Sequence, residues 1–186
     1  MMKGDERLEL VLDTWQTNNR VTEFFFEHLP RELWEMNIPG APQKSVRMLA
    51  GHIHNSRCMW IKMVGRRYGI KPPESVDRRR VTRRNLLRAL KKSNAVVVEL
   101  LRRGLKGDGI LRINVPWANI PSDVVHFMTY LAVHEAHHRG QIIVAARASG
   151  LRLPKEVTSG LWQWKKWSKE IQSRRTAGAR QRNKLQ

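Results

Sequence analysis

The chain has 186 residues, of which 41% are hydrophobic and 27% are charged, and this composition is typical of one soluble globular domain with a sizeable core. Its apolar runs are too short to cross a membrane, its charged N-terminus argues against a secretory signal, and its single cysteine, Cys58, fits a reducing cytoplasm. The formal net charge of +19 attracts nucleic acid, anionic lipid or acidic small molecules, but it carries no information about the fold.

Helical periodicity dominates the first half of the chain. An apolar stripe from Leu8 to Leu29 predicts one helix that ends before Pro30. A second helix is predicted to begin at Ser45, which is a suitable N-cap, and to end near Gly69.

The second half continues the same pattern around one long connection. A third helix is predicted over about 87–105, after a block of arginines, and a fourth over 122–150. The glycine- and proline-rich segment 107–121 between them predicts a long crossover, and a short C-terminal helix is expected around 161–167. We therefore predict an all-α four-helix bundle, with a single domain over 1–171 and a basic, disordered tail over 172–186.

The histidines of the second and fourth predicted helices are candidate metal ligands. At about 100° per residue, His134 and His138 share one helical face, with β-carbons about 5–6 Å apart, whereas His137 falls on the flank. His52 lies on or beside the buried stripe of its helix, and His54, about 200° away, faces elsewhere. His52, His134 and His138 could therefore share one divalent ion with open positions for water or substrate. The alternatives are a surface histidine pair and a hydrogen-bonded core His52.

Two short motifs resemble those of a known family. The block His134-x-x-x-His138-Arg139-Gly140-Gln141, preceded by Gly51-His52-Ile53 and Trp60, resembles the DinB-like (damage-inducible) family of small metal-binding four-helix proteins. The resemblance runs from roughly Leu8 to Trp167. The large positive charge, the arginine block and the basic tail depart from the family pattern, and they leave the substrate open.

The resemblance implies a bundle with a long crossover, frequent homodimers and a divalent metal, usually zinc or nickel, on three histidines. These ligands map to His52, His134 and His138. Related members use the metal to activate a low-molecular-weight thiol for transfer or isomerisation. The resemblance thus implies a metal-dependent enzyme acting on a small molecule, and a thiol-dependent S-transferase is the specific expectation.

His134-Glu135-x-x-His138 also fits the zinc-metalloprotease pattern, in which Glu135 is the general base. A protease needs a third ligand downstream, where only Glu156 and Glu170 are acidic, and it usually needs an edge strand, so this alternative is disfavoured. Glu135 is the one weak catalytic candidate, because an ion pair with Arg139, four residues on, is the favoured interpretation.

Other residues near the histidines have two interpretations each. Arg139 and Gln141 either orient the imidazoles or simply face solvent. Trp60 either lines the metal pocket or packs in the core, and we favour the core.

Two basic blocks support a different class of function. One spans Arg78–Lys92 and the other Lys165–Lys184, and either could contact phosphates. The alternative function is thus a nucleic-acid-binding or stress-related metal-binding protein that uses this basic surface. No nucleic-acid-binding motif accompanies the blocks, so binding to nucleic acid would be weak, non-specific and salt-sensitive.

Overall fold

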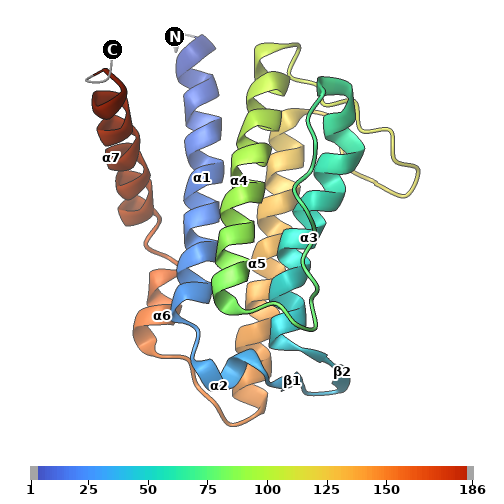
Figure 1. Cartoon of the computed structure of the whole chain (residues 1–186), viewed down its shortest axis with the longest axis vertical. Helices are drawn as coiled ribbons and strands as arrows, with labels where there is room; N and C mark the ends of the chain where they lie inside the picture. The colour runs from blue at the N-terminus through green and yellow to red at the C-terminus, as the bar shows by residue number, and fades with distance from the viewer. Residues whose placement is uncertain (1–3, 184–186) are drawn as a thin grey trace.

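The computed structural model describes the backbone of residues 4–183 and the side chains of 6–176 (Figure 1). Four long helices form its centre, a C-terminal helix of similar length lies outside them, and shorter elements lie at the ends. In chain order the elements are α1 (Gly4–His28), α2 (Arg31–Trp34), β1 (Asn37–Ile38), β2 (Ala41–Ser45), α3 (Val46–Gly65), the 3-10 helix η1 (Arg66–Tyr68), α4 (Arg83–Lys106), α5 (Val124–Ala148), α6 (Lys155–Gly160) and α7 (Trp164–Asn183).

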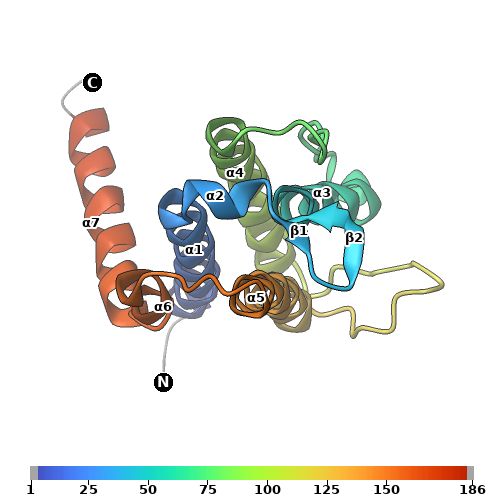
Figure 2. The same cartoon turned by 90° about the horizontal axis from the view of Figure 1, so that it is seen from below.

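Helices α1, α4, α3 and α5 form a four-helix bundle, which confirms the all-α prediction. Each of the four contacts the next in that spatial order, and α5 closes the ring against α1, so α1 and α3 are diagonal to each other (Figure 2). The described strands form only a small antiparallel hairpin between α2 and α3. None of the described helices is both long enough and apolar enough to cross a bilayer.

The segment that crosses the length of the bundle is residues 69–82, between α3 and α4 (Figure 1). At one end, Ile70 N donates to Gly65 O over 3.0 Å, and at the other end Arg47 Nη1 donates to Arg79 O over 2.6 Å. The segment therefore runs back along the whole of α3, which makes α3 and α4 parallel.

The long connection after α4 is also present, but it does not cross the bundle as predicted. Val124 N donates to Gly109 O over 2.9 Å, so α4 ends beside the start of α5. This connection joins two antiparallel neighbours at one end of the molecule.

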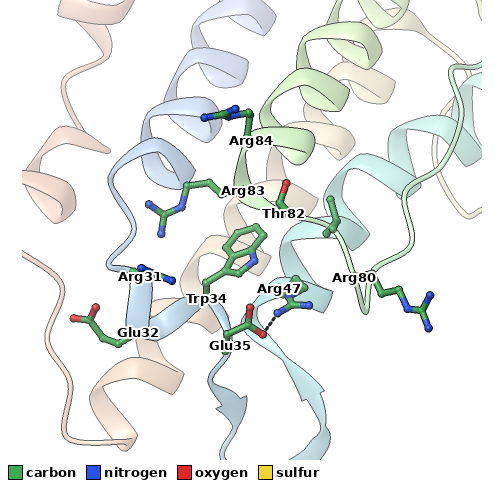
Figure 3. Close-up of a pocket in the computed structure, with 10 residues that line it drawn as sticks. Arg31, Glu32, Trp34, Glu35, Arg47, Arg80, Thr82, Arg83 and Arg84 are labelled. Carbon is green, nitrogen blue, oxygen red and sulfur yellow. Dashed lines mark ion pairs between the residues drawn. The ribbon is translucent and has the colours of Figure 1, made fainter.

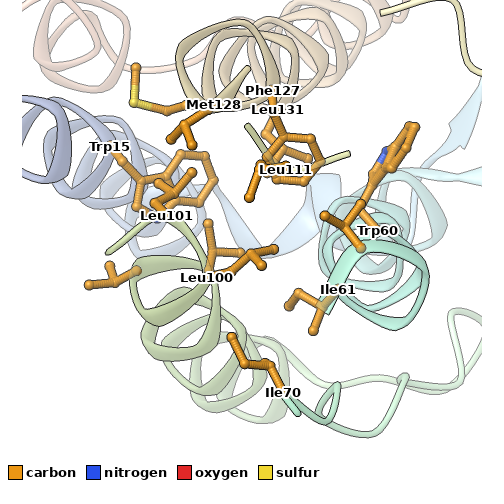
Figure 4. Close-up of a cluster of buried hydrophobic side chains, with 14 of the residues drawn as sticks. Trp15, Trp60, Ile61, Ile70, Leu100, Leu101, Leu111, Phe127, Met128 and Leu131 are labelled. Atoms are coloured by element: carbon orange, nitrogen blue, oxygen red, sulfur yellow. The ribbon is translucent and has the colours of Figure 1, made fainter. Parts of the chain in front are cut away.

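The bundle core consists of two apolar layers with a polar layer between them. One apolar layer centres on Trp15, Trp60, Leu101 and Phe127 (Figure 4), and the other is built around Phe26, at the end where α1 meets the hairpin. The buried polar side chains between the layers come from all four helices: Asn18, Asn19, Thr22, Arg57, Ser93, Glu135 and Arg139. Buried groups of this kind are stable only when they bond to one another.

The C-terminal segment differs from the prediction. Helix α7 continues to Asn183, so residues 172–183, expected to be disordered, are helical, and 184–186 lie outside the described residues. The helix packs along the outer face of α1. Trp167 and Ile171 are buried there, and Arg175 pairs with Glu9 and Asp13 of α1. The prediction of disorder was based on composition, which does not reveal these partners on α1.

Candidate metal centre

Helix α3 brings His52 to the site from a capped N-terminus. The Ser45 side chain accepts a hydrogen bond from Met48 N, as predicted, and this bond satisfies one of the free N–H groups of the first turn. Helix α5 carries the other two histidines, and its N-cap is Asp123 rather than the expected Ser122.

Three imidazoles from these two helices converge. His134 Nε2 lies 3.2 Å from His52 Nε2 and 3.1 Å from His138 Nε2. The three ligand atoms all lie within 4.8 Å of one another, and each ring is partly buried. The structure therefore brings together the three residues that helical geometry selected.

The spacing of the three nitrogens suits a common divalent ion. Two nitrogens that bind one ion at about 2.0–2.1 Å lie about 2.9 Å apart at a right angle and about 3.4 Å apart at a tetrahedral angle. Both observed Nε2–Nε2 separations from His134 fall between these limits. Gln141 Oε1 lies 2.7 Å from His138 Nδ1, and a proton on that nitrogen leaves the Nε2 lone pair free.

The electrostatic environment keeps the three rings neutral. Burial, followed by the neighbouring His138 and His52, lowers the pKa of His134 from 6.5 to about 4. Burial also lowers the pKa of His52 and of His138. The neutral form is the one that offers a lone pair to a metal, so the site needs little deprotonation to bind an ion near pH 7.

The neighbouring histidines do not join this cluster. His137 is exposed, as expected. His54 is fully buried on the other side of α3, where its ring lies 3.1 Å from Ser93 Oγ and 2.9 Å from the Glu74 carbonyl oxygen. Cys58 is buried beside His54, and burial raises its pKa to about 11, so this thiol is chemically quiet.

Comparison with known families supports the resemblance noted in the sequence motifs. A model of the DinB family matches residues 2–166, which is most of the chain. The chain belongs to the DinB family. A search of curated proteins returned no match.

Glu135, which lies beside a candidate ligand in this DinB-family chain, points into the polar layer of the core. Its carboxylate accepts hydrogen bonds from Arg57 Nε at 2.7 Å, Thr22 Oγ1 at 2.7 Å and Asn18 Nδ2 at 3.1 Å. The predicted pair with Arg139 is present at 3.8 Å, but Arg57 is the closer partner. A carboxylate held in this way is poorly placed to act as a general base at the imidazoles.

One aromatic residue that sequence analysis missed, Tyr130, lies beside the site. The Tyr130 ring is nearly parallel to that of His134, with centroids 6.4 Å apart, and its position one turn before His134 could have revealed it. Trp60 is buried against Tyr130 and Phe127, so it packs in the core, as favoured.

A cavity of about 470 Å³ adjoins the site, and both His52 and His138 line it. Its other walls come from the β1–β2 hairpin, α3, Arg78 and the C-terminal half of α5. This volume lies within the usual range for small-molecule pockets.

A second cavity, of about 870 Å³, lies between α2 and the start of α4 and contains none of the three clustered histidines. It is rich in arginine, and Trp34 forms part of its wall (Figure 3). Arg31, Arg83 and Arg84 lie on one side of Trp34, whereas Arg80 extends away on the other side. This DinB-family chain thus carries an arginine-rich concavity to which the basic block noted in the sequence contributes Arg80, Arg83 and Arg84.

Proposed function

We propose that this DinB-family chain is a metal-dependent enzyme that acts on a small molecule, and specifically that it is a thiol-dependent S-transferase. The observation that carries the proposal is the convergence of three neutral imidazoles, two of which, His52 and His138, line a small-molecule-sized cavity. Open access from the cavity favours a catalytic role over a purely structural one.

In this proposal His52, His134 and His138 hold a divalent ion, zinc or nickel. When bound, such an ion is a Lewis acid that lowers the pKa of a water or thiol. Gln141 orients the His138 ring, and the Tyr130 ring lies nearly parallel to the His134 ring. A low-molecular-weight thiol is the co-substrate, as the family resemblance implies.

The metalloprotease alternative has less support. Its general base would be Glu135, whose hydrogen-bond partners lie in the core. The hairpin strands span only 2 and 5 residues, which is short for pairing with an extended peptide.

Metal analysis of purified chain tests the site. We expect about one ion per chain in the wild type, and loss of that ion in His52→Ala and in His138→Ala, because each removes one of three ligands. His137→Ala is the matched control, since this exposed neighbour lies outside the cluster and should leave the ion in place. Retention of the ion in both ligand variants would remove the proposed site.

The reaction is tested with low-molecular-weight thiols and a chromogenic electrophile, with and without added zinc or nickel. We expect metal-dependent consumption of thiol by wild type and by His137→Ala, and none by His52→Ala. If a metal-loaded chain gives no thiol-dependent turnover, the S-transferase assignment fails while the metal site stands.

The remaining predictions belong to the same proposal. We propose a homodimer, as the family resemblance implies, and light scattering of the purified chain tests it. We also propose a reducing, cytoplasmic setting, because Cys58 is a buried free thiol.

Non-specific nucleic-acid binding is the second candidate function. The arginine-rich cavity between α2 and α4 favours it, because guanidinium groups bind phosphates well. The C-terminal block offers Lys165, Lys166 and Lys169 as exposed cations, whereas the side chains of Arg180, Arg182 and Lys184 lie outside the described residues.

A further inference from the structure

The cavity beside the histidines has an apolar part and a cationic part. Met48 and Leu49 of α3 face it from one side, and Val144 and Ala148 of α5 from another. The cationic part is formed by two exposed side chains, Lys44 of β2 and Arg78 of the 69–82 segment.

The fold places Arg78 against α3 through specific contacts. Gly51 allows the close approach, because a β-carbon at this position would lie 3.3 Å from the Arg78 α-carbon and 3.1 Å from its γ-carbon. On one side of Arg78, the Asn55 side chain bonds to both the N–H and the carbonyl of Val76, at 2.8 and 2.9 Å. On the other side, Arg47 donates to the carbonyl of Arg79. The backbone around Arg78 is therefore held next to His52.

The two cations have no carboxylate partner within the part of the chain that the structure describes. Other exposed arginines do find one: Arg103 pairs with Glu99, and Arg174 with Glu170. Neither Lys44 nor Arg78 lies within ion-pair distance of a described acidic side chain. An anion at the mouth of the cavity would give both cations a counter-charge.

We infer that the substrate is a small organic acid, with its carboxylate bound by Arg78 and Lys44 and its apolar body lying along Met48, Leu49 and Val144. This inference rests on the proposed function, because a carboxylate bound at Arg78 and Lys44 would direct the rest of the substrate toward His52 and His138. A guanidinium binds a carboxylate through two parallel hydrogen bonds, so Arg78 is the main determinant of specificity and Lys44 adds charge.

Calorimetric binding to the zinc-loaded full chain tests the inference without any turnover. The probes are 4-phenylbutyrate and its uncharged amide, measured at about 150 mM salt, where charges farther away than about 8 Å are largely screened. We expect the acid to bind about tenfold more tightly than the amide. Arg78→Gln should remove this preference and leave amide binding unchanged, and Lys44→Gln should reduce it.

Arg79→Gln is the matched control, because it removes the same charge from the adjacent position, which does not line the cavity. The inference is overturned if acid and amide bind equally, if the acid does not bind, or if Arg79→Gln weakens acid binding as much as Arg78→Gln.

The same measurements on metal-free chain separate this inference from the proposed function. An acid preference that depends on Arg78 and persists without metal supports the anion subsite even if the transferase assignment fails. A preference that disappears with the metal and ignores Arg78 means that the carboxylate binds the ion itself, which overturns the inference while the metal site stands.

Discussion

At the scale of single residues, the most consequential group is Glu135. Its carboxylate lies between the two apolar layers and is 1% exposed, with Arg57 and Arg139 as its cationic neighbours. Burial alone would raise its pKa, but the charge and hydrogen bond of Arg57 outweigh burial, and the pKa falls below its ordinary value. Glu135 is therefore ionised, and it compensates two buried guanidinium groups.

Glu135→Gln should destabilise the fold by about 3 kcal/mol, because it leaves the two guanidinium groups without their buried counter-charge. Urea unfolding at pH 7 measures this change, and Glu74→Gln, at an exposed position, is the control. The wild-type contribution is present above the pKa of an unfolded glutamate, about 4.3, and disappears as the pH falls through the lower folded pKa. Glu135→Gln should thus lose less stability than the wild type on acidification below about pH 4. Equal free energies of unfolding for the variant and the wild type would contradict the prediction.

The candidate ligands could be selected from the sequence because helical angles depend only on residue spacing. His52, His134 and His138 converge as those angles indicated. An ion pair with Arg139 was expected for Glu135, but its full burial was not. An apolar-stripe argument cannot count polar residues as buried, and here the buried sector of α5 includes both Glu135 and Arg139.

Arg57 was missed for the same reason. Its only signal is a charged residue that interrupts the apolar stripe of α3, one turn after Ile53 and about one turn before Trp60. Its partner lies 78 positions away in the sequence, so spacing within one helix cannot reveal the pair.

At the scale of elements, boundaries with a local chemical signal were predictable. The Ser45 cap is one such boundary. The β1–β2 hairpin was missed, because its strands are too short to show an alternating pattern. The 69–82 crossover was missed because its course along α3 depends on contacts between distant residues, such as Asn55 with Val76.

The junction of α6 with α1 depends on a glycine. A β-carbon at Gly160 would lie 2.3 Å from Cε1 of Phe24, whose ring packs against Trp167 with centroids 4.7 Å apart. Gly160→Ala should therefore destabilise the protein by about 1–3 kcal/mol through overpacking. Thermal or urea unfolding measures the effect.

Gly140→Ala provides the contrast for that experiment. Gly140 lies within α5, and a β-carbon there would have no heavy atom within 4 Å. Removing the backbone freedom of glycine should then stabilise the helix by up to about 1 kcal/mol. Equal stability changes in the two alanine variants would show that the contact with Phe24 does not limit this junction.

At the scale of the whole molecule, positive charge is the dominant property. The arginine-rich cavity lies at the end of the bundle where α2 meets α4, whereas Arg66 and Arg67 lie exposed at the opposite end, where α3 ends. Both regions contribute to the net charge of +19, and the first is concave. The two regions therefore offer a matched comparison for nucleic-acid binding.

We expect weak binding of random duplex DNA that weakens steeply as salt rises from about 50 to about 200 mM. Fluorescence anisotropy across a salt series measures the slope of affinity against salt. The double variant Arg83→Gln/Arg84→Gln should reduce the slope of log affinity against log salt by about 0.9 for each phosphate that the chain no longer neutralises. Arg66→Gln/Arg67→Gln should change it little, and a shallow wild-type slope would argue against nucleic acid as a partner.

The three clustered histidines come from helices that are far apart in sequence, since 82 positions separate His52 from His134. An unfolded chain cannot offer them together, so an ion bound there prefers the folded state and acts as a cross-link between α3 and α5. Free ion at about 100 times its dissociation constant would add about 2.7 kcal/mol to the free energy of unfolding. The melting temperature of the chain should then depend on the metal supply, and depletion of the ion would lower the free energy of unfolding.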